Sequence, residues 1–187
     1  MMRRRTVLAG IGALAAAAQT ATSKLLKPRA LKAGDTVGLI TPSTGVSDPE
    51  KLNTAERTVR YFGLVPKWGK NVSKRAGYLG GSIDERADDL NAMFADDAVK
   101  AVFAIRGGYG SAQILPEIDY EAIKRHPKIF VGYSDITAMH LAIHKMTGLV
   151  TFHGPVPLSA FTDYTQAAYK KALFGTAPLG ELTNPPE

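Results

Sequence analysis

A serine follows a glycine-rich turn in the middle of the chain. The segment reads Arg106-Gly-Gly-Tyr-Gly-Ser111 and comes directly after an apolar stretch, residues 99–105. Three glycines within four positions allow positive φ angles and a close approach of the backbone to a ligand. At a strand-to-helix turn, the hydroxyl of Ser111 could attack a carbonyl while neighbouring N–H groups hold the oxyanion. The spacing differs from G-x-S-x-G, and a phosphate-binding loop capped by Ser111 fits these residues equally well.

A second serine follows a later apolar stretch. Ser134 and Asp135 come directly after residues 129–132 and before a segment with helical periodicity. Either side chain can accept a hydrogen bond from the first turn of that helix, and such capping is sufficient to explain both residues. We therefore interpret this pair as helix caps.

One of the four histidines lies at the end of a predicted strand. His153 would share an edge of the sheet with Ser111, either as its partner or as a structural hydrogen-bonding group. Ser43, after the first predicted strand, is expected to line the same crevice. His140 and His144 have the i, i+4 spacing of zinc ligands, but no third ligand stands out. We expect no metal and no other cofactor.

These residues are positioned by an alternation of strands and helices. Ser-x-x-Glu capping boxes begin at Ser47 and Ser82, each before a helical pattern. Strands are expected over residues 35–41, 64–68, 99–105, 129–133 and 149–152, and helices over 49–61, 82–94, 119–126, 135–146 and 163–174. Such connections predict right-handed crossovers and an α/β fold, with a mainly parallel sheet and helices on both faces. Ligands of these sheets bind beyond the carboxyl ends of the strands.

Composition excludes several classes of protein. The 187 residues are 45% hydrophobic and 21% charged, which is enough apolar material for the core of one ordinary domain. The absence of cysteine excludes disulfides and thiolate nucleophiles. The net charge of +6 includes Arg3, Arg4 and Arg5, and no basic stripe interleaved with aromatic residues follows. Nucleic acid is therefore not an expected partner.

The N-terminus has the pattern of an export signal. Arg4 and Arg5 precede a charge-free run over residues 7–18 that ends in small residues. The run is shorter than the roughly 20 apolar residues of a membrane-spanning helix, so no stable membrane span is expected. The arginine pair also fits a twin-arginine signal. We interpret residues 1–23 as an export signal and the protein as periplasmic, with a cytoplasmic location as the alternative.

Several motifs together resemble one peptidase family. The strings Arg106–Ser111, Gly132-Tyr-Ser-Asp-Ile-Thr137 and His153-Gly-Pro155 are similar, in this order, to those of the LD-carboxypeptidases, which include the microcin-immunity peptidases. The segment over residues 84–96 is similar to the helix before the nucleophile strand of that family. The resemblance covers residues 31–160 and implies a flavodoxin-like N-terminal domain.

The resemblance implies a nucleophile rather than a phosphate-binding loop. By it, Ser111 is the catalytic serine, and the oxyanion hole consists of backbone N–H groups at Ala112 and in the Gly107-Gly108 turn, with Gly108 as the expected donor. Arg106 would either recognise a substrate carboxylate or form a structural ion pair. His153 would not be the triad histidine.

Three residues are therefore expected to line the substrate site: Arg106, Ser43 and His153. The partners that we expect are a murein tetrapeptide and a C-terminal domain, and a homodimer is a further candidate.

The resemblance also implies a second domain. LD-carboxypeptidases complete a Ser–His–Glu triad with residues of a C-terminal domain, whereas residues 30–175 correspond to the N-terminal nucleophile domain and 176–187 to a Pro-rich linker. The full enzyme would release the terminal D-alanine from murein tetrapeptides during peptidoglycan turnover. Without a base, the chain alone would be inactive. An exported anion-binding domain and an inert remnant are the alternatives.

Overall fold

The computed structural model describes residues 25–181, 184 and 185. The predicted export signal, residues 1–23, therefore lies outside the described part of the chain. Within that part, no helix combines the length and the apolar character needed to cross a lipid bilayer.

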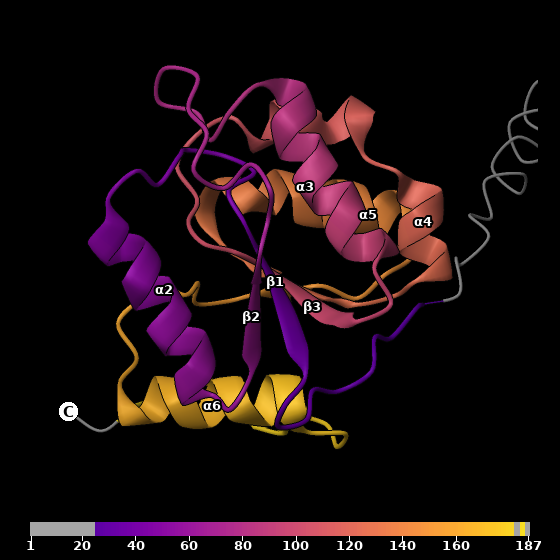
Figure 1. Ribbon diagram of the computed structural model, residues 1–187. Helices are drawn as coiled ribbons and strands as arrows, with labels where there is room; N and C mark the ends of the chain where they lie inside the picture. Colours follow the sequence, from indigo (N-terminus) through magenta and orange to yellow (C-terminus); the bar gives the residue numbers. More distant parts are fainter. Residues whose placement is uncertain (1–24, 182–183, 186–187) are drawn as a thin grey trace, which may run out of the picture.

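A sheet lies at the centre of the described residues (Figure 1). Its five strands are β1 (Thr36–Ile40), β2 (Val65–Trp68), β3 (Val99–Ala104), β4 (Ile129–Gly132) and β5 (Phe152–His153). All pairings are parallel, and the strand order is β2-β1-β3-β4-β5. This confirms the predicted α/β class, and the order is that of flavodoxin-like folds. The winding reverses between β1 and β3, so the crevice beyond their carboxyl ends is the expected ligand site.

Helices cover both faces of the sheet, as predicted (Figure 1). One face carries α3 (Ile83–Ala95), α4 (Tyr120–Arg125) and α5 (Thr137–Thr147), and the other carries α2 (Pro49–Tyr61) and α6 (Asp163–Phe174). Successive strand residues alternate between two cores: Leu39 and Phe103 pack with α2 and α6, whereas Ile40 and Val102 pack with α3 to α5. Each such side chain stabilises the fold by about 1.5–3 kcal/mol when fully buried.

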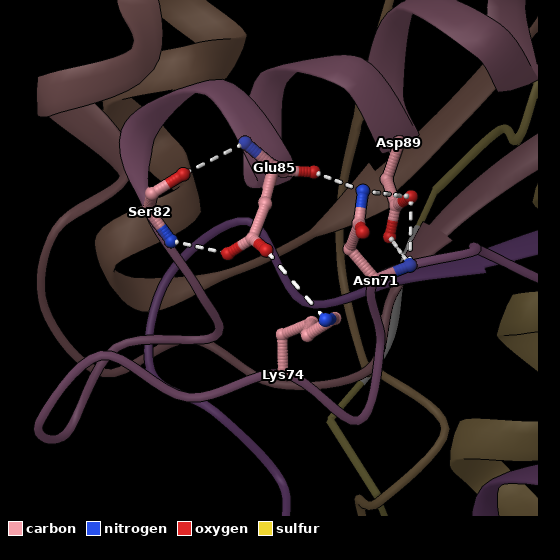
Figure 2. A network of polar contacts seen from close by, with 5 residues as sticks. All are labelled: Asn71, Lys74, Ser82, Glu85 and Asp89. Carbon is pink, nitrogen blue, oxygen red and sulfur yellow. Dashed lines mark hydrogen bonds and ion pairs between the residues drawn. The ribbon is translucent and has the colours of Figure 1, made fainter.

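The predicted N-terminal cap is present at α3, whereas a different residue caps α2. The capping box at α3 is present: Ser82 Oγ accepts from the Glu85 N–H at 3.1 Å, and the Glu85 carboxylate accepts from the Ser82 N–H at 2.9 Å (Figure 2). At α2 the cap is Asp48, not Ser47, because the Asp48 carboxylate accepts from the Glu50 N–H at 3.0 Å.

Two short 3-10 helices follow β3 and β4. One, η1 (Ser111–Glu117), comes after the glycine-rich turn behind β3, and the other, η2 (Ser134–Ile136), leads from β4 into α5. Both candidate serines are thus the first residue of a helical turn at the same edge of the sheet.

Candidate active site

The turn after β4 has the geometry of a nucleophile elbow. Ser134 has a φ of 61°, and within residues 25–181 no other non-glycine residue has a positive φ. Its side chain is exposed, although the strand before it is buried. A Cβ on Gly132 would lie 2.5 Å from Ile136 Cγ2, so only glycine fits two residues before the serine. A left-handed backbone costs a serine about 1–3 kcal/mol, and such strain is found where a turn projects a reactive hydroxyl.

The glycine loop, residues 106–111, lies directly against this elbow. A Cβ on Gly107 would approach the Tyr133 carbonyl oxygen to 3.0 Å and the Ser134 Cβ to 3.1 Å. Gly108, with a φ of 119°, lies against the segment after β1, where a Cβ would be 2.1 Å from Thr44 Oγ1. Side chains are therefore excluded from both positions, and the backbone of the loop passes close to the exposed serine.

Ser111, the predicted nucleophile, is in a different environment. It is fully buried, its hydroxyl donates to the Asp135 carbonyl at 2.6 Å, and its N–H donates to Asp135 Oδ2 at 2.8 Å. A buried hydroxyl that is already committed to a backbone carbonyl does not reach a substrate carbonyl. The geometry thus gives Ser111 a structural role and argues against the predicted catalytic one. The predicted oxyanion role of Ala112 depended on Ser111 and loses its basis with it.

The three predicted substrate-lining residues are not all together. Ser43 is buried and donates its hydroxyl to Asp135 Oδ2 at 2.5 Å, so it supports the site from inside rather than lining it. Arg106 is half-buried and lines a cavity next to Ser134. His153 is exposed at the end of β5, where its ring centroid lies 6.5 Å from that of Tyr133.

This cavity beside the elbow has a volume of about 440 Å³. It is lined by Lys51, Arg106, Gly107, Gly108, Tyr133, Ser134, Val156 and Leu158. Neither of its two cations, Lys51 and Arg106, forms an ion pair in the described part of the chain. The structure therefore does not show the structural ion pair that was one alternative for Arg106. Two cations in one cavity favour the binding of a negatively charged ligand group.

Asp135 joins the elbow to the glycine loop. Burial raises the pKa of its carboxyl, but hydrogen bonds from Ser43, from Ser111 and from the backbone of Gly110 act in the opposite direction and leave the pKa below its usual value. The carboxylate is therefore ionised at neutral pH. It accepts the bonds that hold Ser43 and Ser111 in place.

His140 supports the elbow from α5. It is buried, and its Nε2 lies 3.0 Å from the Gly132 carbonyl oxygen, which requires a proton on Nε2. Burial lowers the pKa of this imidazole, so the ring is neutral at neutral pH. Two further histidines have partners other than Ser134: His126 bonds to Asp97, and His144 bonds to the Leu149 carbonyl.

No hydrogen-bonded base and no metal site accompany Ser134 in the part of the chain described here. Its hydroxyl has no hydrogen-bond partner among those residues. The same residues contain no cluster of three or more His, Cys, Asp or Glu side chains that could hold a metal ion.

Comparison with known proteins decides the family. The LD-carboxypeptidase N-terminal domain family (peptidase S66) matches residues 37–154, which include the glycine loop and the elbow. The chain belongs to the LD-carboxypeptidase family. The resemblance seen in the sequence is thereby confirmed.

Relatives of this LD-carboxypeptidase chain include a probable carboxypeptidase and a self-immunity protein. The probable murein peptide carboxypeptidase of Bacillus subtilis (strain 168) is 50% identical over 169 residues, which cover 83% of this chain and 53% of the relative. The microcin C7 self-immunity protein MccF of Escherichia coli is 36% identical over 139 residues, which cover 72% of this chain and 40% of that protein.

A solved structure shares the fold. The crystal structure of an MccF-like protein from Bacillus anthracis (strain Ames) matches with a TM-score of 0.75 and 33% identity, covering 79% of this chain and 47% of that one. The chain spans about half the length of the curated relatives it matches.

Sequence reasoning assigned Ser134 to helix capping and did not predict its exposed, left-handed position at the turn. The available signal was Gly132, a residue without a side chain two positions before a serine at the end of a buried strand. This half of the elbow pattern is present, although Ile136 stands where G-x-S-x-G has its second glycine.

Proposed function

We propose that this chain is the nucleophile-bearing half of a serine carboxypeptidase and that Ser134, not Ser111, is the nucleophile. The observation that carries this proposal is the exposed, left-handed Ser134 at the strand-to-helix turn, with the glycine loop against it. Ser134 Oγ attacks the scissile carbonyl, and the oxyanion accepts hydrogen bonds from the N–H of Asp135 and from one N–H in the Gly107-Gly108 turn. The N–H of Asp135, the residue after Ser134, thus replaces the N–H of Ala112 as the expected oxyanion donor.

The proposed substrate is a peptide with a free terminal carboxylate. The Bacillus subtilis relative is named a probable murein peptide carboxypeptidase, and a carboxypeptidase must bind the carboxylate next to the bond that it cleaves. Arg106 and Lys51 line the cavity at Ser134, and a guanidinium can bind a carboxylate through two parallel hydrogen bonds. The proposed reaction is release of the terminal D-alanine from a murein tetrapeptide. We also propose that the protein is exported, on the pattern of residues 1–23 alone.

A serine nucleophile needs a general base within about 2.6–3.2 Å and a group that orients this base. Since Ser134 has no such partner among the described residues, we propose that the base and its orienting carboxylate come from the second half that the relatives contain. The interaction between the two halves would then complete the site.

The test uses the joined protein, in which the second half of the Bacillus subtilis relative follows Glu187. Ser134→Ala is expected to lower kcat/KM for D-alanine release from murein tetrapeptide by at least about 10³-fold. Ser111→Ala, the matched control, is expected to cost about 1–3 kcal/mol of stability through its lost buried hydrogen bond and to retain turnover. Near-native turnover by Ser134→Ala would contradict the proposal.

An anion-binding domain without catalysis is the second candidate, because the cavity is lined by two cations that form no ion pair among the described residues. It predicts that the joined protein binds the tetrapeptide, that Arg106→Ala weakens this binding, and that no D-alanine is released. D-alanine release that depends on Ser134 rejects this candidate.

A further inference from the structure

Two charged side chains meet the same peptide group in the glycine loop. The Gly110 carbonyl accepts a hydrogen bond from Arg86 Nη1 at 2.8 Å, and the Ser111 N–H donates to Asp135 Oδ2 at 2.8 Å. This carbonyl and this N–H belong to one peptide unit. Its dipole therefore directs its negative end to a cation and its positive end to an anion, which is favourable for both charges.

The same two side chains hold the segment that follows β1. Arg86 Nη1 also donates to the Pro42 carbonyl at 2.9 Å, and the Ser43 hydroxyl donates to Asp135 Oδ2 at 2.5 Å. The segment after β1 and the glycine loop after β3 are thus each bonded to both Arg86 and Asp135. Burial lowers the pKa of the Arg86 guanidinium, and the Asp135 carboxylate is the foremost of the groups that oppose this effect.

Arg86 is committed to this arrangement. It is 1% exposed, its Nε donates to the Ser82 carbonyl at 3.2 Å, and its Nη2 donates to Gln113 Oε1 at 2.9 Å. Among the described residues it forms no ion pair with a carboxylate. Burying a cation costs free energy unless polar groups bond to it. The carbonyls of Ser82, Pro42 and Gly110 therefore stabilise the buried Arg86 guanidinium.

The helix that carries Arg86 is itself anchored. Asn71 Nδ2 donates to the Glu85 carbonyl at 2.9 Å and to Asp89 Oδ1 at 3.1 Å, and the Asn71 N–H also bonds to the Asp89 carboxylate (Figure 2). These bonds lie on both sides of Arg86 in the sequence. The first turns of α3, from which the Arg86 side chain extends, are therefore held in position by these hydrogen bonds.

We propose that Arg86 and Asp135 are positioning residues that hold the glycine loop against the nucleophile elbow. The inference rests on the proposed function, because the oxyanion donors are assigned to the Gly107-Gly108 turn and to Asp135, the residue after Ser134. One carboxylate and one guanidinium make the loop and the elbow a single rigid unit. Lysine cannot replace Arg86, since an ammonium lacks the planar fork that reaches two carbonyls and Gln113.

The first test is amide hydrogen exchange in the 187-residue chain, compared between Arg86→Met and Lys128→Met. Lys128 is a matched control, because it is also buried and bonds to backbone carbonyls, those of Met93 and Asp96, at the other end of α3. We expect Arg86→Met to accelerate exchange at Ser111 by about 10-fold or more relative to amides of β3, and Lys128→Met to leave this ratio unchanged. An equal ratio in both variants overturns the proposal.

Arg86→Lys keeps the charge and covers the case in which Arg86→Met does not fold. It is expected to give the same local acceleration at Ser111, because one ammonium cannot keep the Pro42 and Gly110 carbonyls and Gln113 together. Exchange at Ser111 equal to that of the wild-type chain overturns the proposal.

The second test is kinetic and uses the joined protein. Arg86→Met is expected to lower kcat for D-alanine release by about 10-fold or more while KM changes less than about threefold, because the oxyanion hole acts in the transition state. Lys128→Met is expected to keep both constants near their wild-type values. An unchanged kcat in Arg86→Met overturns the inference. Turnover that survives Ser134→Ala overturns the proposed function instead, and the exchange test of Arg86 and Asp135 stays valid.

Discussion

Gly108 is where the glycine loop and the segment after β1 come closest. Its φ of 119° is unfavourable for any side chain, and a Cβ would lie 2.1 Å from Thr44 Oγ1, the atom that accepts the Tyr109 N–H. Gly108→Ala therefore has to move either Thr44 or the loop. We expect it to lower the free energy of unfolding by about 1–3 kcal/mol in urea titrations. In the joined protein we expect kcat/KM to fall by about 10²-fold, because the loop carries an oxyanion donor.

Gly154→Ala provides the control for this change. A Cβ at Gly154 would meet nothing within 4 Å, and its φ is not in the left-handed region. We expect its free energy of unfolding to stay within about 0.5 kcal/mol of the wild-type value. Equal stability of the two alanine variants would contradict the close approach seen at Gly108.

Ser111 and Ser134 show where sequence reasoning stops at the scale of single residues. Both follow a buried parallel strand and begin a helical turn, so their sequence environments are alike. The larger number of glycines favoured Ser111, but Gly108 and Gly110 are explained by the close contacts with Thr44 and Leu79. Neither the φ of Ser134 nor the burial of Ser111 can be derived from residue types, because both depend on contacts with distant segments.

At the scale of elements, His140 links α5 to the strand before the elbow. Burial lowers the pKa of this imidazole below its usual value of 6.5, with the bond to the Gly132 carbonyl acting in the opposite direction. The unfolded chain therefore binds the proton more readily than the folded one. The contribution of neutral His140 to stability is fully present above about pH 6.5 and is lost as the pH falls toward the lower pKa of the folded state.

We expect His140→Gln to remove this pH dependence. Glutamine can donate an amide N–H to the Gly132 carbonyl but does not titrate near neutral pH. Between about pH 7 and pH 5, the free energy of unfolding of the wild-type chain should fall more steeply than that of the variant, by at most about 1.4 kcal/mol per pH unit. Parallel curves for the two proteins would show that His140 is not the group responsible.

Most elements could be predicted because their signals are local. The helix over residues 163–174 was predicted at its observed bounds, and the Ser82 box was predicted at its observed place. The fifth strand was not: it lies at Phe152–His153, whereas Leu149 forms an isolated bridge with Leu26. An apolar run indicates a strand but does not tell which of its residues find a partner.

At the scale of the whole molecule, the cavity at Ser134 lies beyond the carboxyl end of β4, which pairs with the edge strand β5. The chain spans about half the length of its curated relatives. What the chain supplies, on this account, is the nucleophile, the oxyanion donors and two cations for the substrate carboxylate.

Covalent labelling of the joined protein with a fluorophosphonate tests the identity of the nucleophile most directly. The probe forms an Oγ–phosphorus bond with an activated serine and releases fluoride, and tryptic digestion separates the candidates: Gly107–Lys124 contains Ser111 as its one serine, and Ile129–Lys145 contains Ser134 as its one serine. We predict that mass spectrometry finds the adduct on Ile129–Lys145, at Ser134, and that Ser134→Ala abolishes it. An adduct on Gly107–Lys124 that persists in Ser134→Ala would contradict the account.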